Sequence, residues 1–130
     1  MAEKYLQIFR SNRKKGARYT MKIGFLFSGQ GSQSVGMGKD LYENFIEIKK
    51  LYEYVEKITG IDIAKISFDG PDVELNKTQN TQLAILIECL GISQILKKNG
   101  IIPDAMAGLS LGEYTALIED GVFNIEDGIN

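Results

Sequence analysis

The serine at position 110 lies in a pattern that suits nucleophilic chemistry. It is the central residue of a Gly-x-Ser-x-Gly segment that runs from Gly108 to Gly112. The two glycines of such a pattern permit a sharp turn between a strand and a helix, and the turn lifts the serine hydroxyl out of the sheet. The helix that follows offers backbone N–H groups to a developing oxyanion, and that of Leu111 is the natural donor. We therefore predict that Ser110 is the nucleophile of an acyl-transfer site.

A glycine-rich loop at residues 28–38 follows the first expected strand. It does not match the phosphate-binding pattern, because Gln33 and Asp40 stand where that pattern requires a glycine and a hydroxyl residue. It also fails the dinucleotide pattern, because Ser34 occupies its last glycine position. We interpret the segment as a tight loop that displays Gln30, whose amide could donate to an oxyanion or a substrate carbonyl. The alternative is that the glutamines only tie the loop to its neighbours.

The sequence contains no histidine and only one cysteine. A disulfide framework and a His/Cys metal cluster are therefore excluded, and we predict no metal site. The single cysteine, Cys89, lies in an apolar helical pattern and is expected to pack as a small hydrophobic side chain. A nucleophilic serine needs a base to take its proton, usually a histidine, and this chain has none.

The order of predicted elements favours an α/β fold with a parallel sheet. An apolar stripe of helical period predicts a helix from near Lys39 that ends at Gly60; its members are Leu41, Phe45, Ile48, Tyr52 and Val55. The other expected elements are a strand at 22–27, a short helix or turn at 61–68, a loop at 69–72, a helix at 82–98 capped by Thr81, a strand at 105–108, a helix at 111–119 and a helix that Asn124 opens.

Composition and charge narrow the class of protein. A chain of 130 residues with 44% hydrophobic and 25% charged residues suits one folded domain, and a net charge of −2 gives no reason to expect nucleic acid. Residues 1–20 hold six basic side chains and one acidic side chain, whereas residues 21–130 hold nine basic and sixteen acidic side chains. We interpret 1–20 as an extension outside the fold; the alternative is a basic arm that binds nucleic acid or a membrane. No apolar run spans a membrane and no secretory signal is visible, so a cytoplasmic location is expected.

Three segments in order give the chain a specific resemblance. They are Phe27–Gln33 (Phe-Ser-Gly-Gln-Gly-Ser-Gln), Thr78–Ala84 (Thr-Gln-Asn-Thr-Gln-Leu-Ala) and Gly108–Tyr114 (Gly-Leu-Ser-Leu-Gly-Glu-Tyr). Together they resemble the N-terminal part of the malonyl-CoA:acyl carrier protein transacylases, the acyltransferases of fatty-acid and polyketide synthesis. Two residues depart from the family pattern, since Leu109 stands where many members have histidine and Leu83 where many have proline.

The resemblance implies a fold and a set of roles. Residues 21–130 would form part of the α/β-hydrolase-like large subdomain with a short parallel sheet, and the ferredoxin-like small subdomain would be absent. Ser110 would be acylated, Gln30 and the Leu111 N–H would form the oxyanion hole, and Gln82 would line the substrate pocket. The family's base histidine and its carboxylate-binding arginine lie far downstream of the serine, outside this sequence.

The implied activity is malonyl transfer from malonyl-CoA to the phosphopantetheine thiol of acyl carrier protein through an acyl-serine intermediate. Malonyl-CoA and acyl carrier protein would be the partners, without nucleic acid, membrane, metal or bound cofactor. Methylmalonyl and acetyl donors stay open. We expect the chain alone to be inactive because it lacks the histidine base. Two other functions remain as alternatives: a serine hydrolase of the α/β-hydrolase class, and a non-catalytic fragment that binds carrier protein.

Overall fold

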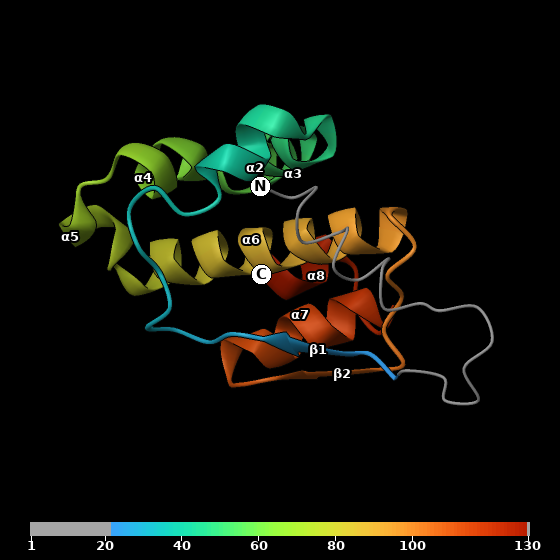
Figure 1. Cartoon of the computed structure of the whole chain (residues 1–130). Coiled ribbons are helices and arrows are strands. Elements are labelled where there is room, and N and C mark those ends of the chain that lie inside the picture. Colours follow the sequence, from blue (N-terminus) through green and yellow to red (C-terminus); the bar gives the residue numbers. More distant parts are fainter. Residues whose placement is uncertain (1–21, 130) are drawn as a thin grey trace.

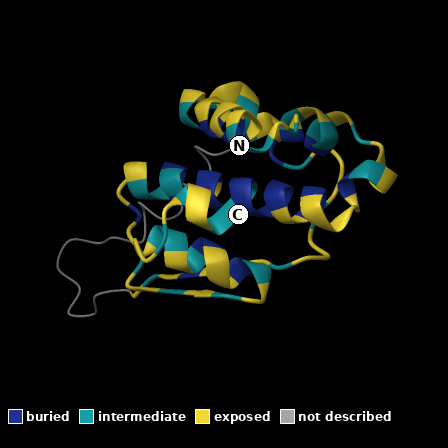
Figure 2. Cartoon of the chain, turned by 180° about the vertical axis from the view of Figure 1, so that it is seen from behind, coloured by how far each residue is buried: buried dark blue, intermediate teal, exposed yellow. Residues whose placement is uncertain are grey.

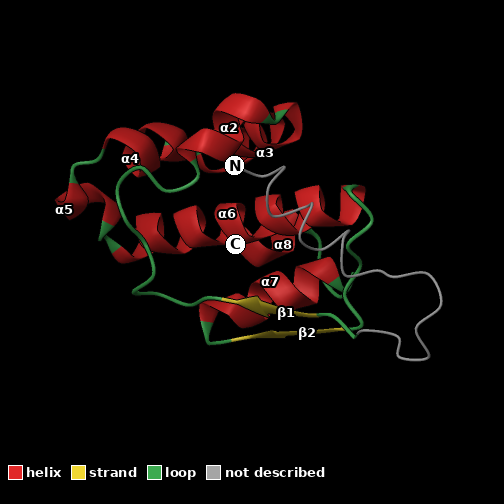
Figure 3. Cartoon of the chain, viewed as in Figure 1, coloured by secondary structure: helices red, strands yellow, loops and turns green. Residues whose placement is uncertain are grey.

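A computed structural model describes residues 22–129 of the chain, so the extension predicted at 1–20 lies outside the described residues. A short sheet lies at one side of the molecule, with the helices on the other side (Figures 1 and 3). In chain order the elements are β1 (Gly24–Phe27), α2 (Lys39–Asn44), α3 (Ile46–Thr59), α4 (Ile63–Asp69), α5 (Asp72–Leu75), α6 (Thr78–Lys98), β2 (Ala105–Gly108), α7 (Leu111–Glu119) and α8 (Ile125–Ile129).

The two strands pair in parallel, as the sequence predicted. Leu26 lies opposite Ala107, and Phe27 lies opposite Gly108. Because side chains alternate across a strand, Phe25 and Phe27 point to one face and are buried, whereas Leu26 points to the other. The fold is thus a short parallel sheet with mostly helical surroundings, which agrees with a part of an α/β domain.

Helix α6 forms the centre of the molecule (Figure 2). Figure 1 shows helices α2 to α5 on one side of α6 and helix α7 on the other, followed by the sheet. Apolar residues occupy most faces of α6, which explains why so much of it is buried. Its buried apolar side chains include Leu83, Ala84, Ile85, Leu86, Ile87, Leu90 and Ile95. Asn99 and Gly100 follow its last turn, as expected from the sequence.

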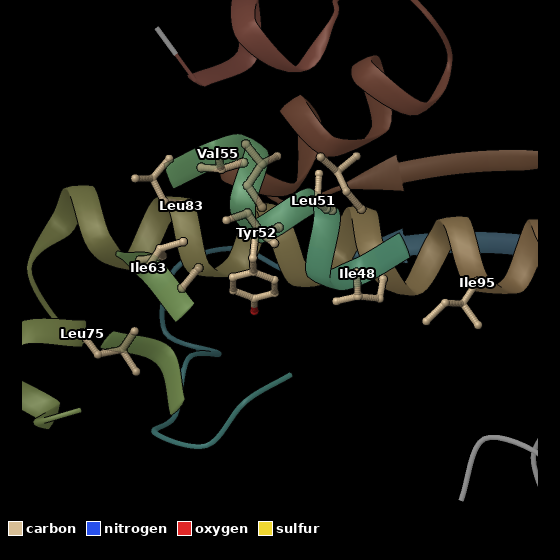
Figure 4. Close-up of a cluster of buried hydrophobic side chains, with 12 residues drawn as sticks. Ile48, Leu51, Tyr52, Val55, Ile63, Leu75, Leu83 and Ile95 are labelled. Carbon is tan, nitrogen blue, oxygen red and sulfur yellow. The ribbon is translucent and has the colours of Figure 1, made fainter. Parts of the chain in front are cut away.

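The apolar stripe before Gly60 is split between two helices. Phe45 adopts an extended backbone with φ −127°, which ends α2 and starts α3, so the prediction of one continuous helix was wrong. The side chain of Phe45 packs against the main core. The inward positions of the stripe are confirmed at Ile48, Tyr52 and Val55, which are buried beside α6 (Figure 4).

The start of α6 also differs from the sequence prediction. The helix begins at Thr78, one turn before the expected start, so Thr81 is not its N-cap. Thr81 is buried inside the helix, and its Oγ1 donates to the carbonyl oxygen of Leu75 at 2.6 Å. Leu75 belongs to helix α5, which the sequence analysis did not predict. The cap predicted at Asn124 is confirmed, since its Oδ1 accepts a hydrogen bond from the Asp127 N–H at 2.8 Å.

Substitutions on opposite sides of α6 test this arrangement. Ile87 has no exposed surface, whereas Ile92 is 40% exposed. We expect Ile87→Ala to lower the free energy of unfolding by roughly 2–5 kcal/mol, because it leaves a cavity, and Ile92→Ala to lower it by less than about 1 kcal/mol. Urea denaturation followed by circular dichroism measures both. Equal losses would contradict the central position of α6.

Candidate active site

Ser110 lies at a sharp turn directly after β2. The ends of β1 and β2 lie side by side, and the Leu109 N–H donates to the carbonyl oxygen of Phe27 at 3.2 Å. The backbone of Ser110 has φ 53° and ψ −109°. Among the residues that the structure describes, it is the only non-glycine residue with a positive φ. The serine side chain is exposed, so the turn presents its hydroxyl to solvent at the carboxyl end of the sheet.

The two glycines of the turn leave no room for side chains. A Cβ atom at Gly108 would lie 1.9 Å from the carbonyl carbon of Gly112, and one at Gly112 would lie 2.3 Å from the carbonyl oxygen of Phe27. Helix α7 therefore packs backbone to backbone against the ends of both strands. This close approach explains why the sequence needs glycine on each side of Ser110.

The first turn of α7 leaves one backbone donor free. The N–H groups of Gly112 and Glu113 bond to the carbonyl oxygens of Leu109 and Ser110, both at 3.0 Å. The Leu111 N–H has no hydrogen-bond partner among residues 22–129. A free N–H beside the serine, at the positive end of the helix dipole, is suited to an oxyanion.

Helix α7 is fixed to α6 at its other end. The carboxylate of Glu119 accepts hydrogen bonds from Ser93 Oγ and Lys97 Nζ, both at 2.5 Å. The Glu119 side chain is only 5% exposed and that of Lys97 is 34% exposed, so the ion pair is partly shielded from solvent. Lys97 also offsets the cost of placing an acid at a helix C-terminus. These contacts hold the helix that carries Ser110 against the core.

The glycine-rich loop lies against the serine turn. A Cβ atom at Gly29 would lie 2.6 Å from the carbonyl oxygen of Leu109 and 3.8 Å from Ser110 Cβ, so Gln30 directly follows a residue in contact with the turn. Gln33 does tie the loop together, because its Oε1 accepts from the Gly31 N–H at 2.8 Å and its Nε2 donates to Asn76 Oδ1 at 2.7 Å.

Gln30 behaves differently from Gln33. Its side chain is exposed and has no hydrogen-bond partner within the described part of the chain. Gln33 therefore ties the loop to its neighbours, as one of the two interpretations expected. The side-chain amide of Gln30 is available to donate to a ligand.

A pocket of about 430 Å³ lies beside the turn, between the starts of α6 and α7. It brings Gln82 and Leu111 together, whereas Ser110 and Gln30 are outside its lining. Gln79 lines it as well, three residues before Gln82 on the first turn of α6. Gln79 was not among the predicted pocket residues, because the helix was expected to start at Gln82. A helix that begins one turn earlier places both amides on one face.

Two ionisable groups of α6 lie near the glycine-rich loop. Cys89 packs beside Ser28, with Sγ 3.7 Å from Ser28 Oγ, and burial raises the pKa of its thiol. Burial also raises the pKa of the neighbouring Glu88 carboxyl, and the charge of Asp40 adds to this effect.

Within the described residues no group of three or more His, Cys, Asp or Glu side chains could hold a metal ion. Over the same residues, no helix has both the length and the apolar character needed to cross a bilayer.

Residues 24–130 of this chain match the sequence pattern of the acyl transferase domain family. The chain belongs to the acyl transferase domain family. The match includes the glycine-rich loop, the start of α6 and the serine turn, so the resemblance stated from three segments is confirmed over nearly all of the described chain.

Individual relatives are malonyl transferases by name. The malonyl CoA-acyl carrier protein transacylase of Bacillus subtilis is 41% identical over 108 residues, which are 83% of this chain and 34% of that protein. The crystal structure of the transacylase from Clostridium perfringens matches with 46% identity and a TM-score of 0.79, over 84% of this chain and 34% of that one.

A third relative was solved with its carrier protein. It is a malonyl-transacylase in complex with a type II polyketide-synthase acyl-carrier protein, with 36% identity and a TM-score of 0.80, over 84% of this chain and 36% of that one. The acyl transferase chain described here thus spans about a third of the length of the relatives that it matches.

The tight backbone contact at the turn can be tested with two glycines. We expect Gly108→Ala to lower the free energy of unfolding by roughly 3 kcal/mol or more, because its methyl group would overlap the backbone of Gly112. Gly24→Ala is the matched control, since a Cβ atom there meets no atom within 4 Å. Chemical denaturation compares the two variants, and similar losses would contradict the packing of α7 on the strand ends.

The strained backbone of Ser110 predicts a stabilising substitution. Ser110→Gly should raise the free energy of unfolding by about 1 kcal/mol, because glycine adopts a positive φ without strain, although it has more chain entropy to lose. Ser110→Ala retains the Cβ atom and should leave stability within about 0.5 kcal/mol of the parent chain. Thermal and urea denaturation measure both, and a Ser110→Gly variant no more stable than Ser110→Ala would show that the turn is not strained.

Proposed function

We propose that this acyl transferase domain takes part in malonyl transfer from malonyl-CoA to the phosphopantetheine thiol of acyl carrier protein. The observation that carries the proposal is the strained serine at the start of α7, with the free Leu111 N–H beside it. The exposed Gln30 amide in the adjoining loop adds a second donor. The activities for which the relatives are named supply the substrate class.

The reaction consists of two acyl transfers through one serine ester. Ser110 Oγ loses its proton to a base and attacks the thioester carbonyl of malonyl-CoA. The Leu111 N–H and the Gln30 amide donate to the oxygen of the tetrahedral intermediate. The carbon–sulfur bond then breaks, and CoA leaves with the proton from the base. In the second transfer the carrier thiol gives its proton to the base and attacks the ester, the carbon–oxygen bond breaks, and the base passes the proton to Ser110 Oγ.

The base and the carboxylate-binding cation must come from polypeptide outside this sequence. The chain has no histidine, and Arg18 is its last arginine. A histidine would take the serine proton, and an arginine would pair with the malonyl carboxylate in a bidentate manner. Gln82 and Gln79 would line the acyl pocket beside Leu111. We place the missing groups in the part that corresponds to the remaining length of the relatives.

The test compares the chain alone with a chimera in which residues 22–129 replace the matched segment of the Bacillus subtilis transacylase. With malonyl-CoA, the chimera should form a malonyl ester at Ser110 and pass it to carrier protein. The chain alone should turn over at least roughly 10³-fold more slowly than a typical enzyme rate of ~10 s⁻¹, because it lacks the base. Mass spectrometry locates the ester, and a carrier-protein mass shift measures transfer.

Matched variants separate the alternatives. Ser110→Ala should abolish the ester, and Ser32→Ala in the glycine-rich loop should retain it. Transfer of the acyl group to water instead of the carrier thiol would favour the serine hydrolase. Parallel reactions with acetyl-CoA and methylmalonyl-CoA define the acyl preference. An ester that persists in Ser110→Ala would overturn the proposed nucleophile.

The absent histidine favours one second candidate, a non-catalytic fragment that binds carrier protein. In that case the chain alone would bind holo-acyl carrier protein in calorimetry and would form no serine ester with malonyl-CoA. Binding that is unchanged in Ser110→Ala, together with no ester in the chimera, would select this function.

A further inference from the structure

The direction of the Gln30 side chain depends on its backbone. Among residues 22–129 its amide has no hydrogen-bond partner, and the side chain is exposed. The peptide groups on either side of Gln30 therefore decide where the amide lies. On one side, Gly29 packs closely against the carbonyl oxygen of Leu109. On the other side, a Cβ atom at Gly31 would meet no atom within 4 Å, so that glycine needs another contact to hold it.

The side chain of Gln33 supplies that contact. The Gly31 N–H donates to Gln33 Oε1 at 2.8 Å. Gly31 has φ 102°, and glycine moves between backbone conformations more easily than other residues, so this bond restricts a peptide group that would otherwise sample more orientations. The same peptide group joins Gln30 to Gly31. Its orientation therefore restricts the backbone angles of Gln30 and the direction of the Gln30 amide.

The other end of the Gln33 side chain is anchored at the corner between α5 and α6. The loop after β1 passes the start of α6 (Figure 1), and there Gln33 Nε2 donates to Asn76 Oδ1 at 2.7 Å. Directly before Asn76, the carbonyl oxygen of Leu75 accepts from the buried Thr81 Oγ1 of α6 at 2.6 Å. Hydrogen bonds thus connect the central helix through the α5–α6 corner and Gln33 to the loop that carries Gln30.

We propose that Gln33 is the positioning residue of the oxyanion donor Gln30, that it acts through the Gly31 peptide group, and that Asn76 is its anchor. Gln33 touches no reacting atom in this role. A donor that is already in place needs no rearrangement in the transition state, so a displaced donor should slow formation of the serine ester more than it weakens binding of malonyl-CoA. This inference rests on the proposed function, because it assigns a role within that reaction.

The chemistry of the two amides provides matched variants. The Gly31 N–H requires an acceptor, which leaves Gln33 Nε2 to meet Asn76 Oδ1. Gln33→Glu keeps an acceptor for Gly31, and Asn76 can turn its amide so that Nδ2 donates to the new carboxylate. Asn76→Asp keeps an acceptor for Gln33 Nε2. Only the double variant sets two carboxylates face to face, and the adjacent cation, Lys77, is already paired with Glu74.

The contact itself can be tested in the full chain without the reaction. Exchange of the Gly31 amide proton with solvent, measured by NMR, should be similar in the parent chain, Gln33→Glu and Asn76→Asp. In the double variant Gln33→Glu/Asn76→Asp it should be at least about threefold faster, because the N–H loses its fixed acceptor. An exchange rate in the double variant equal to that of the parent chain would overturn the proposal.

The effect on chemistry is measured in the chimera that carries residues 22–129, as the single-turnover rate of malonyl-ester formation. Each single variant should react within about threefold of the parent chimera, and the double variant at least about tenfold more slowly, as expected for a displaced oxyanion donor. The malonyl-CoA concentration that gives half the maximal rate should change by less than about threefold. In a Gln30→Ala background the double substitution should slow the reaction by less than about threefold further, because no amide is left to position.

Several outcomes separate this role from a general structural one. A double variant as fast as the single variants, or a single variant as slow as the double variant, would overturn the role of Gln33. So would an equally large loss in the Gln30→Ala background. If Gln30→Ala alone left the rate unchanged, Gln30 would not be the oxyanion donor and the positioning role would fail with it. A parent chimera that forms no ester would refute the proposed function itself, and the Gly31 exchange rates would then separately decide whether Gln33 and Asn76 hold the loop.

Discussion

The approach of three backbone segments at the serine turn is the constraint on which the rest of the structure depends. The end of β1, the end of β2 and the start of α7 meet at distances that only glycine permits at positions 108 and 112. This contact fixes the direction of α7 relative to the sheet. It also imposes the strained backbone of Ser110 and leaves the Leu111 N–H without a partner among the described residues. The same backbone contacts therefore pack α7 against the strand ends and position Ser110 and the Leu111 N–H.

Helix α6 stabilises the turn from the opposite side. It buries apolar residues against α3 and α4 and also holds α7 through the partly shielded pair of Glu119 and Lys97. Its first turn contributes Gln79 and Gln82 to the pocket beside Leu111. A single helix thus connects the main core, the serine turn and the pocket, so changes in its packing are expected to reach the site.

The two sides of the molecule differ in how completely their apolar side chains are buried. The side of α2 to α6 has a continuous core in which Val55, Ile63 and Ile87 have no exposed surface. The sheet side leaves Leu26 exposed, and the sequence contains no histidine that could serve Ser110 as a base. The chain shares its fold with relatives of which it spans about a third.

Short-range patterns determined much of this protein in the sequence itself. The Gly-x-Ser-x-Gly segment predicted the strand, the turn and the helix around Ser110, because steric limits on backbone angles act over a few residues. The apolar period placed Ile48, Tyr52 and Val55 inward, and the missing histidine was visible by counting. Tertiary structure decided what depends on distant contacts. Phe45 interrupts the predicted helix and packs against the core, and Thr81 lies inside α6, where its hydroxyl donates to the Leu75 carbonyl oxygen. The separation of Gln30 from Gln33, one amide free and one bonded to Asn76, and the exposure of Leu26 likewise follow from what each side chain meets across the fold.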